Sequence, residues 1–337
     1  MKEVLEMKMW KRVIPFALAL TLLAGCGESA VIPESDVTLE MDDEAYVDIV
    51  EMEEVDLEDE MIALAGAPAV STMLVPEASG KQTAKNEKAT IDYSNIKDGY
   101  VMVNFTAATT KRLKVKVIGP AVTYTYDLTK GVWTTFPLSD GNGDYQVKVY
   151  EQTEGTKYAV VLSQKFNVTL TDEFAPFLRP NQYVDYANAT NTIAMAKTLA
   201  GNISDPLTKV EVIYNYVVGN FTYDYNRAAN PPTGYLPVLD SVLAEKKGIC
   251  FDYAALMTGM LRSQGVPCKL VVGYAGTVYH AWVSVWTKET GWVDGVIRFD
   301  GSSWQRMDPT FASSNKSSEK IMKYIGDGSN YNSMYFY

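Results

Sequence analysis

Apolar and polar residues alternate along much of Ala89 to Leu170, which is the period expected of half-buried β-strands. Turn-forming segments separate the alternating runs, at Lys97-Asp98-Gly99, Thr129-Lys130-Gly131 and Asp140-Gly141-Asn142-Gly143. The predicted strands are Thr90–Tyr93, Tyr100–Phe105, Leu113–Val117, Thr123–Tyr126, Trp133–Phe136, Tyr145–Tyr150 and Phe166–Leu170. Seven short strands in so little chain predict an antiparallel sandwich of the immunoglobulin or fibronectin type III kind. This stretch contains no catalytic cluster, so its expected role is a spacer or a binding platform.

The pattern changes near Pro176, where helical spacing replaces alternation. Residues 187–200 are compatible with a helix, and Ser204-Asp205-Pro206 supplies a cap and a first-turn proline for another, through Val218. Two more helices are predicted, one at Pro237–Lys247 that stops at Gly248 and one at Cys250–Gln264. The second has an apolar stripe along one face, so it is expected to pack as a central element. Strands follow at Lys269–Tyr274, Val278–Thr287, Gly291–Phe299 and Trp304–Met307. Helices followed by an antiparallel sheet predict an α+β domain.

The N-terminus has the pattern of an export signal. Lys8, Lys11 and Arg12 precede an apolar run from Val13 to Ala24, which is short for a membrane span. The run ends in Leu23-Ala24-Gly25-Cys26, which resembles the bacterial lipobox, in which the signal is cut before a cysteine that is then lipidated. The alternative is an ordinary secretory signal. The lipobox predicts a mature chain that begins at Cys26 and is anchored on the outer face of the membrane.

Composition separates a charged spacer from the rest of the chain. Residues 34–60 contain fourteen Asp or Glu and no Lys or Arg. The formal net charge of the whole chain is −11, so the residues outside this block sum to a net charge of +3. Such a block stays solvated and extended, and the near-neutral remainder gives no support for nucleic-acid binding. One histidine and three scattered cysteines exclude a disulfide scaffold and a zinc site, and no cofactor is predicted. The predicted organisation is a signal over 1–25, a tether over 26–86, a sandwich over 87–171 and the α+β domain over 172–337.

Cys250 and His280 are the candidate reactive pair. Cys250 opens a predicted helix, where unpaired N–H groups and the helix dipole stabilise a thiolate, although most free cysteines are small buried hydrophobes. His280 is the single histidine and lies in an apolar strand, so it is either a satisfied core residue or the base for Cys250. Asp294, Asp300 and Asp308 compete as the group that orients the imidazole.

Three ordered motifs resemble the transglutaminase-like superfamily. They are Gly248-Ile249-Cys250-Phe251-Asp252-Tyr253-Ala254, His280-Ala281-Trp282 and Trp304 through Asp308-Pro309-Thr310, and the resemblance covers roughly residues 174–312. It implies a papain-like core and a catalytic triad of Cys250, His280 and Asp308, which favours Asp308 over the other two aspartates.

Two further features of the predicted site are open at this point. The backbone N–H of Cys250 is the natural oxyanion donor, and Tyr223, Tyr225 and Tyr235 are candidates for the rim of the site. Cys268 is expected to be a buried strand residue rather than the partner of Cys250 in a regulatory disulfide.

The sequence therefore predicts an exported, lipid-anchored cysteine acyltransferase. Cys250 would form a thioester from a carboxamide or peptide bond of a protein or peptide at the cell surface, and an amine or water would resolve it. A cysteine peptidase of surface or cell-wall peptides is one alternative. A non-catalytic surface binding module is another, although an intact Cys/His/Asp set argues against it.

Overall fold

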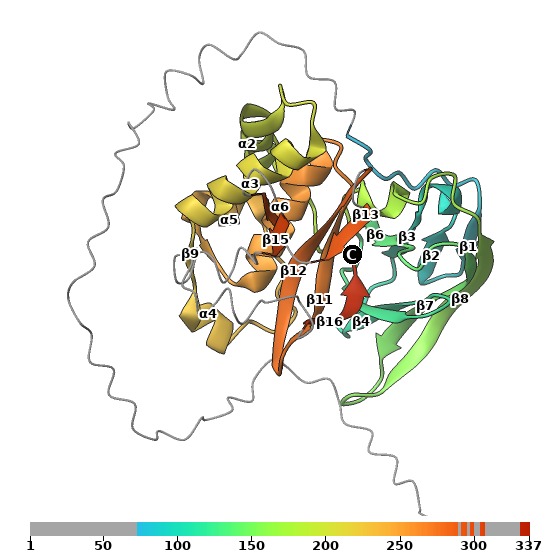
Figure 1. Cartoon of the computed structure of the whole chain (residues 1–337). Coiled ribbons are helices and arrows are strands. Elements are labelled where there is room, and N and C mark those ends of the chain that lie inside the picture. The colour runs from blue at the N-terminus through green and yellow to red at the C-terminus, as the bar shows by residue number, and fades with distance from the viewer. Residues whose placement is uncertain (1–72, 289–290, 295–296, 300–303, 307–330) are drawn as a thin grey trace, which may run out of the picture.

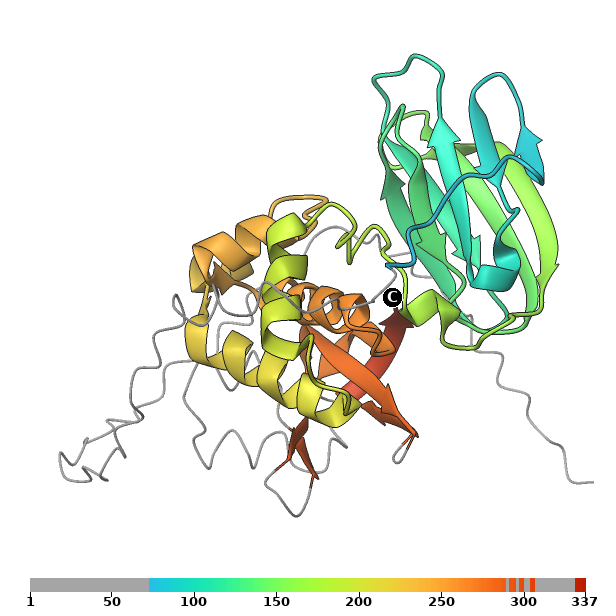
Figure 2. The same cartoon turned by 90° about the horizontal axis from the view of Figure 1, so that it is seen from above.

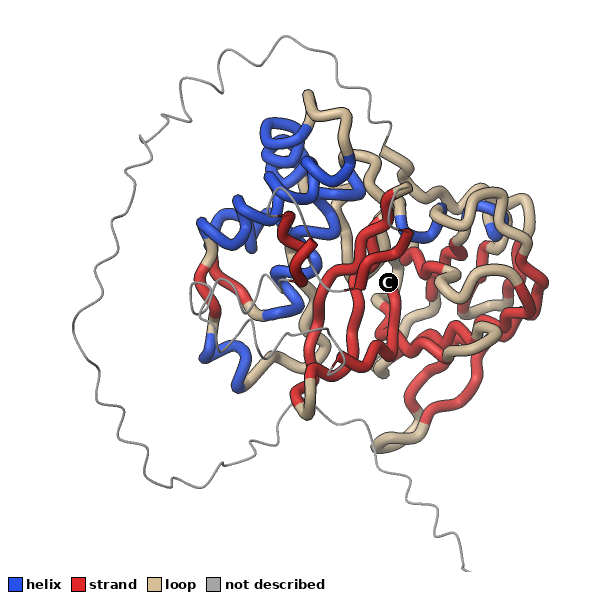
Figure 3. The backbone as a smooth tube through the Cα atoms, in the orientation of Figure 1, coloured by secondary structure: helices blue, strands red, loops and turns tan. Residues whose placement is uncertain are grey.

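The chain folds into an N-terminal β-structure and a C-terminal mixture of helices and strands, seen in a computed structural model (Figure 1). The structure describes residues 73–288, 291–294, 297–299, 304–306 and 331–337. Helices gather on one side of the C-terminal sheet, and the N-terminal strands lie beyond its other side (Figure 3). The predicted order of a strand region followed by an α+β region is therefore what the described residues show.

Two four-stranded antiparallel sheets make up the N-terminal part. One contains β1 (Thr83–Lys85), β2 (Ala89–Asp92), β3 (Tyr100–Phe105) and β6 (Thr134–Pro137), in that order. The other has the order β5 (Thr123–Leu128), β4 (Leu113–Ile118), β7 (Gly143–Gln152), β8 (Tyr158–Val168). Alternate residues of β4 are buried, and residues from both sheets share one hydrophobic core. A short 3-10 helix, η1 (Ile96–Asp98), precedes β3.

Six of the seven predicted N-terminal strands lie where the alternation places them, and the seventh overlaps only the end of the observed strand. Strand β8 spans Tyr158–Val168 instead of Phe166–Leu170, and the short β1 was not predicted. Strand β8 is an edge strand with mostly exposed or half-buried residues, so its sequence lacks the regular buried positions that reveal a strand. The relationship to immunoglobulin or fibronectin type III domains stays a prediction.

Five helices of the described chain follow the 3-10 turn η2 (Ala175–Phe177). They are α2 (Thr190–Ala200), α3 (Pro206–Asn220), α4 (Tyr225–Ala229), α5 (Leu239–Glu245) and α6 (Cys250–Ser263). Asp205 caps α3 as predicted, because its carboxylate accepts a hydrogen bond from the Thr208 N–H at 2.7 Å and Pro206 occupies the first position. The predicted stop at Gly248 was wrong. Helix α5 ends at Glu245, since Lys246 adopts a left-handed conformation with φ of 47°.

The C-terminal sheet provides the surface on which the helices pack. Its antiparallel order is β13 (Gly291–Asp294), β12 (Val278–Thr287), β11 (Cys268–Ala275), β16 (Tyr331–Phe336). Helix α6 packs against β11 and β12 on one side and against α2, α3 and α5 on the other, which confirms it as a central element. The remaining strands form two short pairs, β9 (Thr222–Tyr223) with β10 (Lys247–Gly248) and β14 (Ile297–Phe299) with β15 (Trp304–Arg306).

A cluster of tyrosines, which we call the junction cluster, joins the two parts of the chain. Its members are Tyr124 and Tyr126 from β5, Tyr183 from the connecting segment, and Tyr335 and Tyr337 at the end of the chain. The Tyr183 and Tyr337 rings lie 4.4 Å apart, and Tyr337 is only 5% exposed. Figure 2 shows the end of the chain between the N-terminal sheets and the helices. The boundary predicted at residue 171 stays a prediction, but the two parts share buried aromatic contacts.

No helix in the described ranges is both long enough and apolar enough to cross a membrane.

Candidate active site

Cys250 is the first residue of α6 and is half-buried. The residue before it, Ile249, has extended backbone with φ of −98° and ψ of 176°, and its side chain has no atom that can accept a hydrogen bond. The first-turn N–H groups of a helix have no partners within the helix, and they carry the positive end of its dipole. The predicted placement of the thiol at a helix N-terminus is therefore what the structure shows.

His280 lies in β12 and is 5% exposed. Its ring centroid is 6.2 Å from that of Trp282, in a stacked arrangement, and 6.5 Å from that of Tyr331. Opposite His280 in the sheet is Gly273, where a side chain would collide with the Trp282 ring and the main-chain oxygen of Asn332. The missing side chain at Gly273 thus leaves room for the aromatic surroundings of the imidazole.

The structure brings together the elements that carry Cys250 and His280, because α6 packs directly on β12. The next residue of β12, Ala281, belongs to the core shared with α6, whereas His280 alternates onto the face with Trp282. Strand β13 pairs with β12 only from Ser284 to Thr287. In the described part of the sheet, His280 is therefore in an edge segment of β12. Contact between the imidazole and the thiol stays a prediction.

Two of the three aspartates proposed to orient His280, Asp300 and Asp308, lie outside the described residues. Asp294 is in β13 and pairs with Ser284, four residues along β12 from His280. That separation corresponds to about 13 Å along a strand, so the register places the Asp294 backbone far from the imidazole. The choice of Asp308 over Asp300 thus stays a prediction, whereas the strand register disfavours Asp294.

Cys268 is fully buried in β11, and both it and Cys250 are free thiols. Its sulfur lies 3.8 Å from the hydroxyl oxygen of Thr258 in α6, and burial raises the pKa of the Cys268 thiol to about 12. Cys268 is therefore a structural thiol, as expected, and the described chain has no Cys250–Cys268 disulfide. Groups of three or more potential metal-ligating side chains do not occur in the described ranges.

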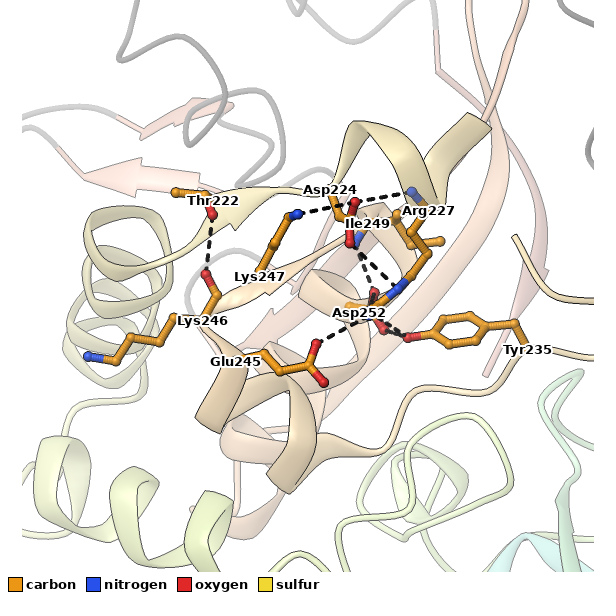
Figure 4. A network of polar contacts seen from close by, with 9 residues as sticks. All are labelled: Thr222, Asp224, Arg227, Tyr235, Glu245, Lys246, Lys247, Ile249 and Asp252. Carbon is orange, nitrogen blue, oxygen red and sulfur yellow. Dashed lines mark hydrogen bonds and ion pairs between the residues drawn. The ribbon is translucent and has the colours of Figure 1, made fainter. Parts of the chain in front are cut away.

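A polar network beneath the N-terminus of α6 was not predicted (Figure 4). At its centre is Asp252, the third residue of the helix, whose side chain is fully buried. One carboxylate oxygen accepts a hydrogen bond from the Tyr235 hydroxyl at 2.6 Å, and the other accepts one from the Ile249 N–H at 2.8 Å. Arg227 of α4 adds an ion pair to Asp252 at 3.5 Å. Desolvation raises the pKa of Asp252, although these three partners oppose the shift.

Arg227 connects this carboxylate to the neighbouring elements. Its guanidinium donates to the Tyr235 hydroxyl at 3.2 Å and to Glu245 of α5 at 3.2 Å. Asp224 caps α4 through the Arg227 N–H and lies 3.5 Å from the ammonium of Lys247 in β10. Strand pairing of β9 with β10 fixes the chain entering α6, including the hydrogen bond from Thr222 N–H to the Lys246 carbonyl at 3.0 Å. Side chains from three elements therefore hold the segment that leads to Cys250.

The three tyrosines considered for the rim of the site differ in position. The Tyr235 hydroxyl is bonded to Asp252 and supports the helix, so it is not positioned as an oxyanion donor. Tyr225 is 64% exposed, and its ring packs edge-on against Tyr223 at 5.0 Å. Tyr223 also approaches Tyr253 of α6 at 6.5 Å. Tyr223 and Tyr225 thus stay candidates for the rim of the site.

Comparison with known proteins agrees with this arrangement. Residues 193–309 match the model of the transglutaminase-like superfamily, and the match includes α6 and β12 with Cys250 and His280. Residues 193–309 form a transglutaminase-like domain. The predicted family is confirmed, and the matched range lies inside the predicted one.

Two curated relatives of this transglutaminase-like domain are similar over part of their length. A protein-glutamine gamma-glutamyltransferase of Pseudomonas aeruginosa is 27% identical over 114 residues, which is 29% of this chain and 17% of that protein. The uncharacterized protein YebA of Bacillus subtilis is 30% identical over 104 residues, which is 25% of this chain and 14% of that protein. The chain therefore spans less than a fifth of the length of either relative.

Solved structures show a looser likeness. The periplasmic domain of TgpA from Pseudomonas aeruginosa is 17% identical, with a TM-score of 0.32 over 66% of this chain and 95% of that one. Red sea bream transglutaminase is 14% identical, with a TM-score of 0.27 over 63% of this chain and 48% of that one. The family assignment comes from the matched residues 193–309 and not from these low scores.

Proposed function

We propose that the protein is a cysteine acyltransferase of the transglutaminase-like superfamily, with Cys250 as nucleophile, His280 as acid and base, and Asp308 as the group that orients His280. The observation that carries the proposal is the position of Cys250, half-buried at the first residue of a central helix within the matched family range. The presence of His280, the single histidine of the chain, within the same matched range supports it.

The proposed reaction has two steps. The Cys250 thiolate attacks a carboxamide or peptide carbonyl, and the N–H groups in the first turn of α6 stabilise the oxyanion that forms. The carbon–nitrogen bond then breaks, His280 gives its proton to the departing amine, and a thioester remains on Cys250. In the second step an amine or water loses a proton to His280, attacks the thioester and releases the thiolate.

The proposal includes the place where the enzyme acts. The Leu23-Ala24-Gly25-Cys26 segment supports export and lipidation of Cys26, which would attach the chain to the outer face of the membrane. The acidic residues 34–60 would then separate the folded part from that surface. Proteins and peptides at the cell surface are accordingly the proposed substrates.

Incubation of the full chain with a glutamine-containing peptide and a labelled primary amine tests the proposal. Incorporation of the amine is expected with the native chain and should fall by at least about 10³-fold in Cys250→Ala, because no other group replaces the nucleophile. Mass spectrometry of the acid-quenched enzyme should show the peptide acyl group on Cys250.

Cys268→Ala is the matched control, since it removes the buried thiol of β11 and leaves Cys250 in place. It should retain the activity of the native chain. Peptide-bond cleavage without amine incorporation would assign the chain to the peptidase alternative, whereas deamidation of the glutamine would show that water resolves the thioester. Absence of any acyl group on Cys250 with glutamine peptides and surface extracts would contradict the enzyme and favour a binding module.

A further inference from the structure

The carboxylate of Asp252 is placed unusually for a helix that begins with a reactive thiol. Asp252 is two residues after Cys250, in the same first turn, and its side chain is fully buried. A negative charge there favours the helix, but it opposes a thiolate at the same N-terminus. The structure shows this carboxylate folded back onto the Ile249 N–H and covered by two donors, Tyr235 and Arg227.

We propose that Tyr235 and Arg227 are positioning residues that hold the Asp252 carboxylate against the Ile249 N–H and reduce its effect on the Cys250 thiolate. The proposal rests on the proposed role of Cys250 as nucleophile. Asp252 fixes the first turn of α6, and its two partners limit the electrostatic cost of a carboxylate in that turn.

The absence of a side chain at Gly248 supports this arrangement. A Cβ atom there would lie 2.6 Å from the Asp252 Cβ and 2.9 Å from its Oδ2 atom. Only glycine at position 248 therefore leaves room for the Asp252 carboxylate to fold back toward the Ile249 N–H. The short hydrogen bond from Tyr235 at 2.6 Å joins the other carboxylate oxygen to the loop before α5.

Other charged and titratable groups lie on the elements that adjoin α6 or the segment leading into it, and they must be considered in any pH dependence. They come from the elements around the segment that leads into the helix and from the strand packed on it: Asp224 and Arg227 of α4, Tyr235 of the loop, Glu245 of α5, Lys247 of β10, Tyr183 beside Phe251, and His280 of β12. Arg227 lies 3.7 Å from Asp224 and 3.5 Å from Asp252, and Lys247 lies 3.5 Å from Asp224. Asp252 is distinguished from the other two carboxylates by its complete burial and by its position within the first turn.

The test is the pH profile of Cys250 alkylation by iodoacetamide in the full chain, measured for the native protein, Tyr235→Phe and Asp252→Asn. Removing the Tyr235 hydroxyl exposes the thiolate to more of the carboxylate charge, so the midpoint should rise by about half a pH unit. Replacing the carboxylate by an amide removes the charge and keeps an acceptor for the Ile249 N–H, so the midpoint should fall by about one pH unit.

Opposite shifts distinguish positioning from a purely structural role, which would lower the melting temperature of both variants without moving the two midpoints apart. Tyr216→Phe is the matched control, because it removes a half-buried hydroxyl of α3 that has no bond to Asp252, and its midpoint should stay at the native value. Unchanged midpoints, or shifts in one direction for both variants, would overturn the proposal.

If Asp252→Asn does not fold, Tyr235→Phe and Arg227→Gln decide the question. An upward shift in both supports the proposal, and no shift in either overturns it. Alkylation requires no acyl substrate, so this test can succeed or fail separately from the amine-incorporation assay. Failure of this proposal is therefore distinguishable from failure of the proposed function.

Discussion

The two ends of helix α6 are held in opposite ways. At its N-terminus, side chains from the surrounding elements secure the chain around a half-buried Cys250. At its C-terminus, the buried guanidinium of Arg262 donates to three main-chain oxygens of the described residues, those of Cys268 at 2.6 Å, Arg179 at 2.8 Å and Tyr337 at 2.6 Å.

The difference separates a reactive end from an anchoring end. Main-chain oxygens move only when their segments move, so Arg262 ties together the connecting segment, β11 and the end of β16. Burial lowers the pKa of Arg262 to about 10, which keeps it charged at neutral pH, and a cation is favourable at a helix C-terminus. The N-terminal end is instead held by hydrogen bonds and ion pairs between side chains, and Cys250 at this end is half-buried.

Thiol reactivity should show the largest contrast between the two ends. Iodoacetamide at neutral pH should modify Cys250 at least about 10³-fold faster than Cys268, because Cys268 is fully buried and reacts only through opening of the structure. Peptide mapping by mass spectrometry measures both rates in one sample. Equal rates in the folded chain would contradict the assignment of Cys268 to the anchored end.

Removal of the anchor should have the next largest effect. Arg262→Met keeps the length of the side chain but leaves buried main-chain oxygens without donors, so the free energy of unfolding should fall by about 3–5 kcal/mol in urea titration. Arg112→Met is the control, since its ion pair with Asp127 is exposed and should contribute less than about 1 kcal/mol. If the ends are independent, the folded Arg262→Met protein keeps the native midpoint of Cys250 alkylation.

A conventional cap gives the smallest expected effect. Asp205→Ala removes the side-chain cap of α3 and should cost about 1 kcal/mol at neutral pH, with no change at Cys250. Hydrogen bonds from Thr208 lower the pKa of Asp205, so its stabilisation is present above the unfolded value of about 3.9 and is lost as the pH falls. Thermal unfolding of the native and Asp205→Ala chains, from neutral to acidic pH, measures this stabilisation. A difference in melting temperature that stays constant down to acidic pH would contradict the role of Asp205 as a cap.

The sequence pattern was sufficient to locate those helices and strands that bury one face and expose the other. Strand β12 has the predicted bounds, and α3 begins at the proline after the predicted cap, because alternation and capping are local properties of the sequence. Strand β16 was missed since its residues alternate only between half-buried and exposed, and α4 was missed because five residues give no clear period. Both elements depend on contacts with distant segments.

Within the candidate site, the reactive residues were predictable and their support was not. Cys250 and His280 stand out by chemistry and by motif, so the sequence indicates their roles before any contact is seen. The Asp252–Tyr235–Arg227 network joins three segments, and no spacing along the chain shows that the Tyr235 hydroxyl reaches a carboxylate seventeen residues away. Asp252 did carry a local signal, because an acidic residue at the third position of a helix is typical of a capping interaction.

The junction cluster has a consequence for how this protein can be recombined with others. Tyr183, Tyr335 and Tyr337 pack on Tyr124 and Tyr126 of β5, and Tyr183 also contacts Phe251, the residue after Cys250. A chimaera that grafts the transglutaminase-like part onto a foreign N-terminal domain would expose these rings to water unless the new domain supplied matching aromatic residues. The two parts therefore pack as one unit, and we expect a crossover that preserves the protein to fall before β1 or to keep β5 together with the junction tyrosines.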